Sequence, residues 1–80
     1  MKVPRDLGGQ ELVKVLCRDW GYWQVHQEGS HVVLQTEQPF HHRIAVPAHK
    51  SLRIGTLNAI LKTVARHKNV SRDDILRSLG

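Results

Sequence analysis

The first quarter of the chain carries apolar residues at intervals of three and four. This spacing places side chains on one face of an α-helix. The apolar stripe consists of Leu12, Val13, Leu16, Cys17 and Trp20. It predicts a helix from about Gly9 to Asp19, and we expect Gly21 to end this helix because glycine adopts the left-handed backbone conformation at little steric cost.

Three segments of alternating polarity follow and predict strands. They are Tyr22 to Gln27, Ser30 to Thr36 and Arg43 to Val46. Pro39 separates the second segment from the third, and Pro47 ends the third. Glu28 and Gly29 join the first two segments and are expected to form a two-residue hairpin turn.

This turn fixes an expected register, because Gln27 and Ser30 would flank the loop. His26 then lies opposite His31 on one face of the hairpin. The expected pairs on the other face are Val25 with Val32 and Trp23 with Leu34. That apolar face should pack against the helices, so Trp20, Trp23 and Leu34 are expected to belong to the core.

The last third of the chain again has the helical period. A basic loop from Ala48 to Ile54 precedes Gly55 and Thr56, which are expected to open a second helix with the apolar stripe Leu57, Ile60, Leu61, Val64 and Ala65. Ser71 begins the sequence Ser-Arg-Asp-Asp, which is typical of a helix cap and predicts a short last helix. The expected order is helix, three strands, helix, short helix, which defines an α+β fold with an antiparallel sheet.

The charge of the chain indicates the class of partner. The 80 residues include 12 Lys and Arg against 7 Asp and Glu, a formal net charge of +5. Such a chain is long enough for one domain with a thin core, and its charge favours an anionic partner such as a nucleic acid. The single cysteine, Cys17, excludes an intramolecular disulfide and favours the cytoplasm. Met1 to Asp6 lack the apolar run of a signal peptide, and we expect no contact with a membrane.

Three short motifs together indicate a family. They are Gly29-Ser30-His31 at the hairpin, Val46-Pro47-Ala48-His49 after the third strand, and Gly55-Thr56-Leu57 leading into Ile60-Leu61. In this order and spacing, from about Leu7 to Ala65, the chain resembles the HicA-type toxin family. The resemblance implies one HicA-like domain over residues 1–80, with a core from about 7 to 67 and a short C-terminal helix at 71–79.

Several functional expectations come with this resemblance. It implies a fold like the double-stranded-RNA-binding domain and a metal-independent ribonuclease that cleaves messenger RNA, without a cofactor, as the toxin of a toxin–antitoxin system. It also implies a HicB-type antitoxin as the partner protein. The family's essential histidine maps onto His31, supported by the turn residues Gly29 and Ser30. Val32 follows the motif here, where many relatives carry a histidine or an aromatic residue.

The chemistry of RNA agrees with a histidine in this role. The ribose 2′-hydroxyl is a built-in nucleophile, so cleavage requires that it lose a proton and that the departing 5′-oxygen gain one. Histidine exchanges protons near neutral pH and can serve either step, so we expect His31 to be catalytic. If His26 lies opposite His31, the two could divide the acid and base roles, whereas the alternative is that His26 is a solvated strand residue.

A second group of residues is expected to bind RNA phosphate. A helix N-terminus presents free amide groups and a partial positive charge. Lys50 and Arg53 stand just before the amides of Gly55 and Thr56. We interpret these four residues as a phosphate clamp, against the alternative of an ordinary polar loop.

Other patterns leave alternatives open. His41, His42 and His49 invite a zinc hypothesis, which we reject because neighbouring histidines on a strand point to opposite faces. Phe40 and the two histidines after it could stack on an RNA base or belong to a solvated loop. The main functional alternative is a non-catalytic RNA-binding module of the same fold, and a second is a DNA reader built from 56–67 and 71–79.

Overall fold

The computed structural model describes residues 6–79. In chain order the elements are α1 (Gly9–Asp19), β1 (Trp23–Glu28), β2 (His31–Thr36), β3 (His42–Pro47), α2 (Ile54–Lys68) and α3 (Arg72–Leu79). The predicted α+β fold is confirmed, with its order of helix, three strands, helix and short helix. The predicted bounds of α1 are also confirmed. The ends of the other elements lie within one or two residues of the predicted ends, and α2 extends to Lys68.

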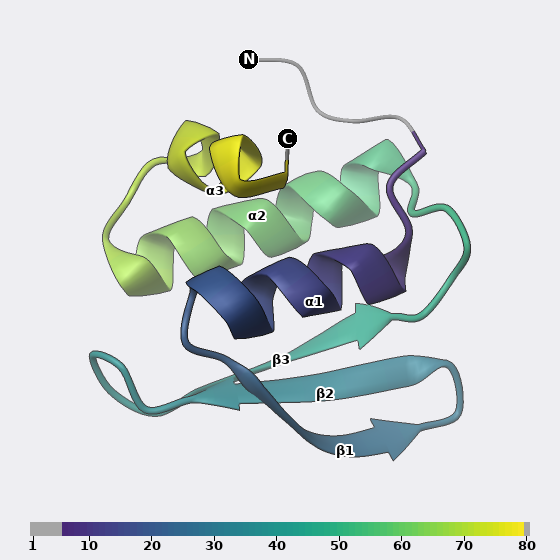
Figure 1. The fold of residues 1–80 in the computed structure, drawn as a ribbon, viewed down its shortest axis with the longest axis horizontal. Helices are drawn as coiled ribbons and strands as arrows, with labels where there is room; N and C mark the ends of the chain where they lie inside the picture. The colour runs from purple at the N-terminus through teal and green to yellow at the C-terminus, as the bar shows by residue number, and fades with distance from the viewer. Residues whose placement is uncertain (1–5, 80) are drawn as a thin grey trace.

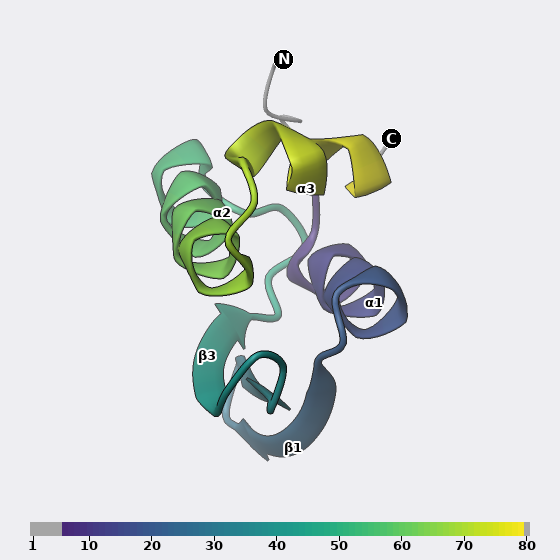
Figure 2. The same cartoon turned by 90° about the vertical axis from the view of Figure 1, so that its left-hand side faces the viewer.

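The elements form layers (Figures 1 and 2). The three strands make one antiparallel sheet in the order β1-β2-β3. Both α1 and α2 lie against one face of this sheet, and α3 lies across the helices on the side away from it. Within residues 6–79 the other face of the sheet has no covering element. No helix in this part of the chain is long and apolar enough to span a bilayer.

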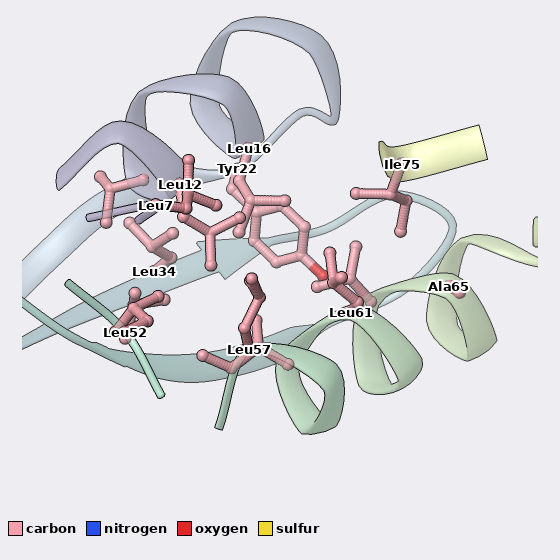
Figure 3. Packing of buried hydrophobic residues seen from close by; sticks show 14 of the residues in the cluster. Leu7, Leu12, Leu16, Tyr22, Leu34, Leu52, Leu57, Leu61, Ala65 and Ile75 are labelled. Atoms are coloured by element: carbon pink, nitrogen blue, oxygen red, sulfur yellow. The ribbon is translucent and has the colours of Figure 1, made fainter. Parts of the chain in front are cut away.

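The core lies between the helices and the central strand (Figure 3). In β2, Val32, Leu34 and Thr36 are fully buried, while the intervening residues face outward. This alternation is the expected signature of a strand with one buried face. The leucines that meet there from the helices are Leu12, Leu16, Leu57 and Leu61, all fully buried. The last helix contributes Ile75 to the same cluster.

The predicted hairpin register is wrong. Glu28 pairs with His31, so the two-residue turn consists of Gly29 and Ser30 rather than Glu28 and Gly29. Gly29 has φ +60°, and Ser30 has no positive φ. A type II′ turn requires this pattern, with glycine at the first central position only, whereas a turn at Glu28-Gly29 would have placed glutamate there.

A bulge in β1 further changes which residues face the helices. The ladder shifts between Gln24 and His26, so Val25 has no partner and Trp23 lies opposite Gln35. A bulge inserts one extra residue and thereby reverses the facing of the residues beyond it. The prediction that Trp23 belongs to the core is therefore wrong, since 43% of its surface is exposed. Leu34 is in the core as predicted, and Trp20 packs against its edge.

The ends of the helices follow their sequence signals. Gly21, at φ +72°, follows α1 in the left-handed conformation that only glycine adopts freely. At the start of α3, Ser71 and Asp74 cap each other: the Asp74 amide donates to the Ser71 hydroxyl at 3.1 Å, and the Ser71 amide donates to the Asp74 carboxylate at 3.0 Å. The predicted cap is thus confirmed.

Candidate functional site

His31 is the first residue of β2 and lies at the hairpin end of the sheet. Its side chain is exposed, because successive residues of a strand face opposite sides and the next residue, Val32, faces the core. On one side it pairs with Glu28 of β1, and on the other with Pro47 at the end of β3. The Ala48 amide donates to the Ser30 carbonyl, which ties the loop after β3 to the hairpin turn. His31 therefore lies where the hairpin and the β3–α2 loop meet, and Figure 1 shows both segments at the same end of the sheet.

The hypothesis that His26 lies opposite His31 is wrong. His26 pairs with Val33, so it stands diagonally from His31. Diagonal neighbours on one face of an antiparallel pair are about 7–8 Å apart, compared with about 5 Å for opposed residues. The His26 ring is exposed and its Nε2 lies 3.9 Å from a carboxylate oxygen of Glu28. The residue directly opposite His31 is thus a carboxylate and not a second imidazole.

The four residues of the expected phosphate clamp lie around the start of α2. Lys50 and Arg53 are exposed, and Arg53 is the residue at which the helix is capped. Within residues 6–79 no side chain of this cap bonds to the first helical amides, and the first turn holds no acidic residue. Gly55 is exposed and Thr56 is half-buried. This helix end therefore presents free donors at the same end of the sheet as His31 (Figure 1).

A second group of aromatic and titratable side chains lies at the opposite end of the sheet. The Tyr22 hydroxyl and His42 Nδ1 are 3.2 Å apart, and the His42 ring stacks on His67 with 4.3 Å between centroids and 16° between planes. Burial raises the pKa of Tyr22 to about 12. Burial lowers the pKa of His42, and the positive charges of His67, Lys68 and His41 lower it further.

The other histidines of the rejected zinc hypothesis stand apart. His41 Nδ1 lies 2.7 Å from a carboxylate oxygen of Glu37, and His42 belongs to the stacked pair instead. His49 is exposed in the β3–α2 loop, where its carbonyl accepts a bond from the Gly9 amide. The three histidines are thus in three different environments.

Sequence reasoning missed two features of these sites. Glu28 was assigned to the turn, although a Gly-Ser pair is itself a type II′ signal that would have placed Glu28 opposite His31. His67 was not singled out, although it continues the apolar stripe of α2 three residues after Val64 and is 8% exposed. A polar residue at a position that the helical period assigns to the core is the signal that could have found it.

A comparison with protein families identifies the family of this chain. Residues 9–69 match the model of the HicA toxin of bacterial toxin–antitoxin systems. The chain therefore belongs to the HicA toxin family, as its motifs indicated. A search of curated proteins gave no match, and neither did a search of solved structures.

Proposed function

We propose that the protein is an endoribonuclease toxin that cleaves messenger RNA, and that His31 is its catalytic residue. The proposal depends above all on the placement of His31, which is exposed at the end of β2, beside the loop that carries Lys50 and Arg53. Membership of a toxin family supplies the biological setting. A toxin of this family requires an antitoxin, for which we propose a HicB-type protein, and we expect both to act in the cytoplasm.

The proposed reaction uses only the RNA and side chains of this protein. His31 takes the proton of the ribose 2′-hydroxyl, the 2′-oxygen bonds to the adjacent phosphorus, and the bond from phosphorus to the 5′-oxygen breaks. The products are a 2′,3′-cyclic phosphate and a 5′-hydroxyl, whose proton comes from the protonated imidazole or from water. Because RNA supplies the nucleophile, this route requires no metal-bound hydroxide.

The phosphate clamp supports the same reaction. Lys50, Arg53 and the amides of Gly55 and Thr56 can hold phosphates of an RNA that reaches the His31 end of the sheet. Lysine and arginine close to a phosphate also favour RNA binding at low salt. We propose that these four residues position the RNA and that His31 performs the proton transfer.

The test is RNA cleavage by the wild type and by His31→Gln. A positioned acid or base contributes about 10² to 10⁴ to the rate, so the variant should lose at least about two orders of magnitude of activity. Its melting temperature should stay unchanged, because the ring is exposed. His41→Gln is the matched control, since His41 is an exposed histidine at the other end of the sheet, and it should retain full activity.

Two outcomes would contradict the proposal in different ways. Full activity in His31→Gln would remove His31 from the mechanism. RNA binding without cleavage by the wild type would favour the non-catalytic RNA-binding module. His26→Ala tests the remaining role for the diagonal histidine: a shared role predicts that one limb of the pH–rate profile disappears, whereas an unchanged profile assigns the catalysis to His31 alone.

A further inference from the structure

A pocket of about 310 Å³ opens at the end of the molecule away from His31. It lies between the start of β3 and the last turns of α2, and its lining residues are Phe40, His42, Thr63, Arg66 and His67. His31 and Thr36 are the two ends of β2, and Thr36 pairs with His42. At about 3.4 Å per residue, five steps along β2 separate its two ends by about 17 Å, so the pocket lies at least about that far from His31.

The pocket has flat aromatic walls. Phe40 meets His67 edge to face, with 4.6 Å between centroids and 78° between planes, and His67 in turn stacks on His42. Phe40 is 64% exposed, so its ring is open to a ligand. Such surfaces suit a planar heterocycle, because every nucleobase can stack on an aromatic ring.

Polar side chains also line the pocket. His67 is 8% exposed, and its Nε2 has no hydrogen-bond partner among the described residues. Buried polar atoms are nearly always bonded, so a ligand group that hydrogen-bonds to this nitrogen would remove the cost of leaving it unpaired. The exposed Arg66 on the pocket wall adds a guanidinium, which binds phosphate well. The lining includes no carboxylate, and the nearby Glu37 is engaged by His41.

We propose that this pocket binds one unpaired ribonucleotide of the RNA, with its base against Phe40 and the histidine pair and its phosphate on Arg66. The inference rests on the proposed function, because it gives the same RNA a second binding place at least about 17 Å from the scissile bond. An RNA long enough to reach both places is bound more tightly than a short one. The pocket thereby selects single-stranded segments on one side of the cleavage site.

The first experiment measures nucleotide binding independently of cleavage. Adenosine and uridine 5′-monophosphates contain no bond that the enzyme could cut, and their titration into the wild type is followed by NMR. We expect shifts at the amides of Thr63, Arg66 and His67. Phe40→Ala and Arg66→Ala should each weaken binding about tenfold, as expected for the loss of one stacked ring or one charged hydrogen bond. Trp23→Ala and Lys62→Ala are the matched controls, an exposed aromatic residue and an exposed cation outside the pocket, and should leave affinity within about twofold.

Further titrations test whether the pocket prefers a nucleotide to a simple sugar phosphate or to a protein. Ribose 5-phosphate should bind at least about tenfold more weakly than either nucleotide, because it lacks the base. Equal binding would show an anion site and overturn the proposal. So would nucleotide shifts confined to the His31 end, or an absence of nucleotide shifts. If only a HicB-type antitoxin shifts the pocket resonances, the pocket is a protein-binding surface and the proposal is wrong.

The second experiment measures substrate length dependence. Phe40→Ala should raise the KM for an RNA that spans both places about tenfold and leave the KM for a dinucleotide unchanged, since a dinucleotide at His31 cannot reach the pocket. An equal change for both substrates would contradict the inference. A wild type that binds nucleotides in the pocket but cleaves no RNA would instead contradict the proposed function and leave the pocket supported.

Discussion

Glu28 lies directly opposite His31 across the β1–β2 ladder. Their Cβ atoms are therefore about 5 Å apart on the uncovered face of the sheet. The Glu28 carboxylate lies 3.9 Å from His26 Nε2, and from its place opposite His31 the same exposed side chain can turn to the His31 ring and stabilise the positive charge that forms when that ring takes a proton. We interpret Glu28 as a positioning residue for the proposed base.

Replacement of Glu28 by glutamine separates this role from a structural one. The variant should lower kcat about two- to fivefold, because an exposed ion pair that forms between Glu28 and the protonated His31 would contribute up to about 1 kcal/mol. KM for RNA should fall, since a negative charge near a polyanion has been removed. Steady-state kinetics on one RNA substrate measure both, with Glu37→Gln at the far end of the sheet as the control. An unchanged kcat would exclude the positioning role.

The clamp at the start of α2 predicts a change in salt dependence. Lys50→Glu with Arg53→Glu should weaken RNA binding, because two cations that neutralise RNA phosphates are removed. The slope of log affinity against log salt is negative. It should become shallower by about 1.4, which is about 0.7 for each single-strand phosphate that the protein no longer neutralises. The measurement is RNA binding at several salt concentrations.

The control for this variant has the same net charge. Lys14→Glu with Lys62→Glu lowers the formal charge from +5 to +1, as the clamp variant does, because each replacement changes the charge by two and both pairs change it by four. Both control lysines are exposed on helices. Equal slopes in the two double variants would show that only net charge matters, and the clamp hypothesis would fail.

Two glycines predict opposite effects on stability. A Cβ at Gly9 would overlap the carbonyl oxygen of Pro47, where α1 meets the end of β3, whereas a Cβ at Gly55 would have nothing within 4 Å. Gly9→Ala should therefore destabilise the fold by about 1–3 kcal/mol, and Gly55→Ala should be neutral or stabilise it by up to about 1 kcal/mol. Chemical denaturation measures both, and an undisturbed Gly9→Ala would contradict the close packing of α1 on the end of β3.

The environment of His42 predicts a loss of stability in mild acid. Its pKa is lowered by burial and by the charges of His67, Lys68 and His41. Below about pH 6.5 the unfolded chain therefore binds a proton at His42 more readily than the folded chain does. The stability that depends on a neutral His42 is fully present above that pH and is lost as the pH falls toward the folded pKa.

His42→Gln removes this titration. The melting temperature of the wild type should fall more steeply than that of the variant between about pH 7.5 and pH 5. Asp19 and Asp74 also have lowered pKa values, but their contributions are lost only below the ordinary carboxyl value of 3.8. Parallel curves for the two proteins would contradict the assignment to His42.

Tyr22 gives the corresponding prediction in alkali. It is the only tyrosine of the chain, and burial raises its pKa from 10.0 to about 12. The stability that depends on the neutral phenol is present below about pH 10 and is lost as the pH rises toward about 12. Absorbance of the tyrosinate should appear near pH 12 in the native protein and near pH 10 in denaturant. A native midpoint near 10 would show that the ring is not buried as described.

Periodicity determined the elements and their order. The helical stripe from Leu12 to Trp20 defined α1, and the Ser71 cap defined the start of α3, because both signals are local and depend on few neighbours. The motif around His31 likewise indicated the family that the comparison shows. Local signals of this kind predict the structure correctly because the backbone geometry of a helix or a turn is fixed within a few residues.

Only the tertiary structure decided which residues meet. A shift of two residues in the hairpin moved Glu28 into the place expected for His26, and one bulged residue turned Trp23 outward. The pocket joins Phe40 to Arg66 and His67, which lie more than twenty residues away in the chain. Pairing across strands depends on the turn type and on packing against the helices, so the sequence determines the elements while the assembled fold determines the neighbours of each proposed catalytic and binding group.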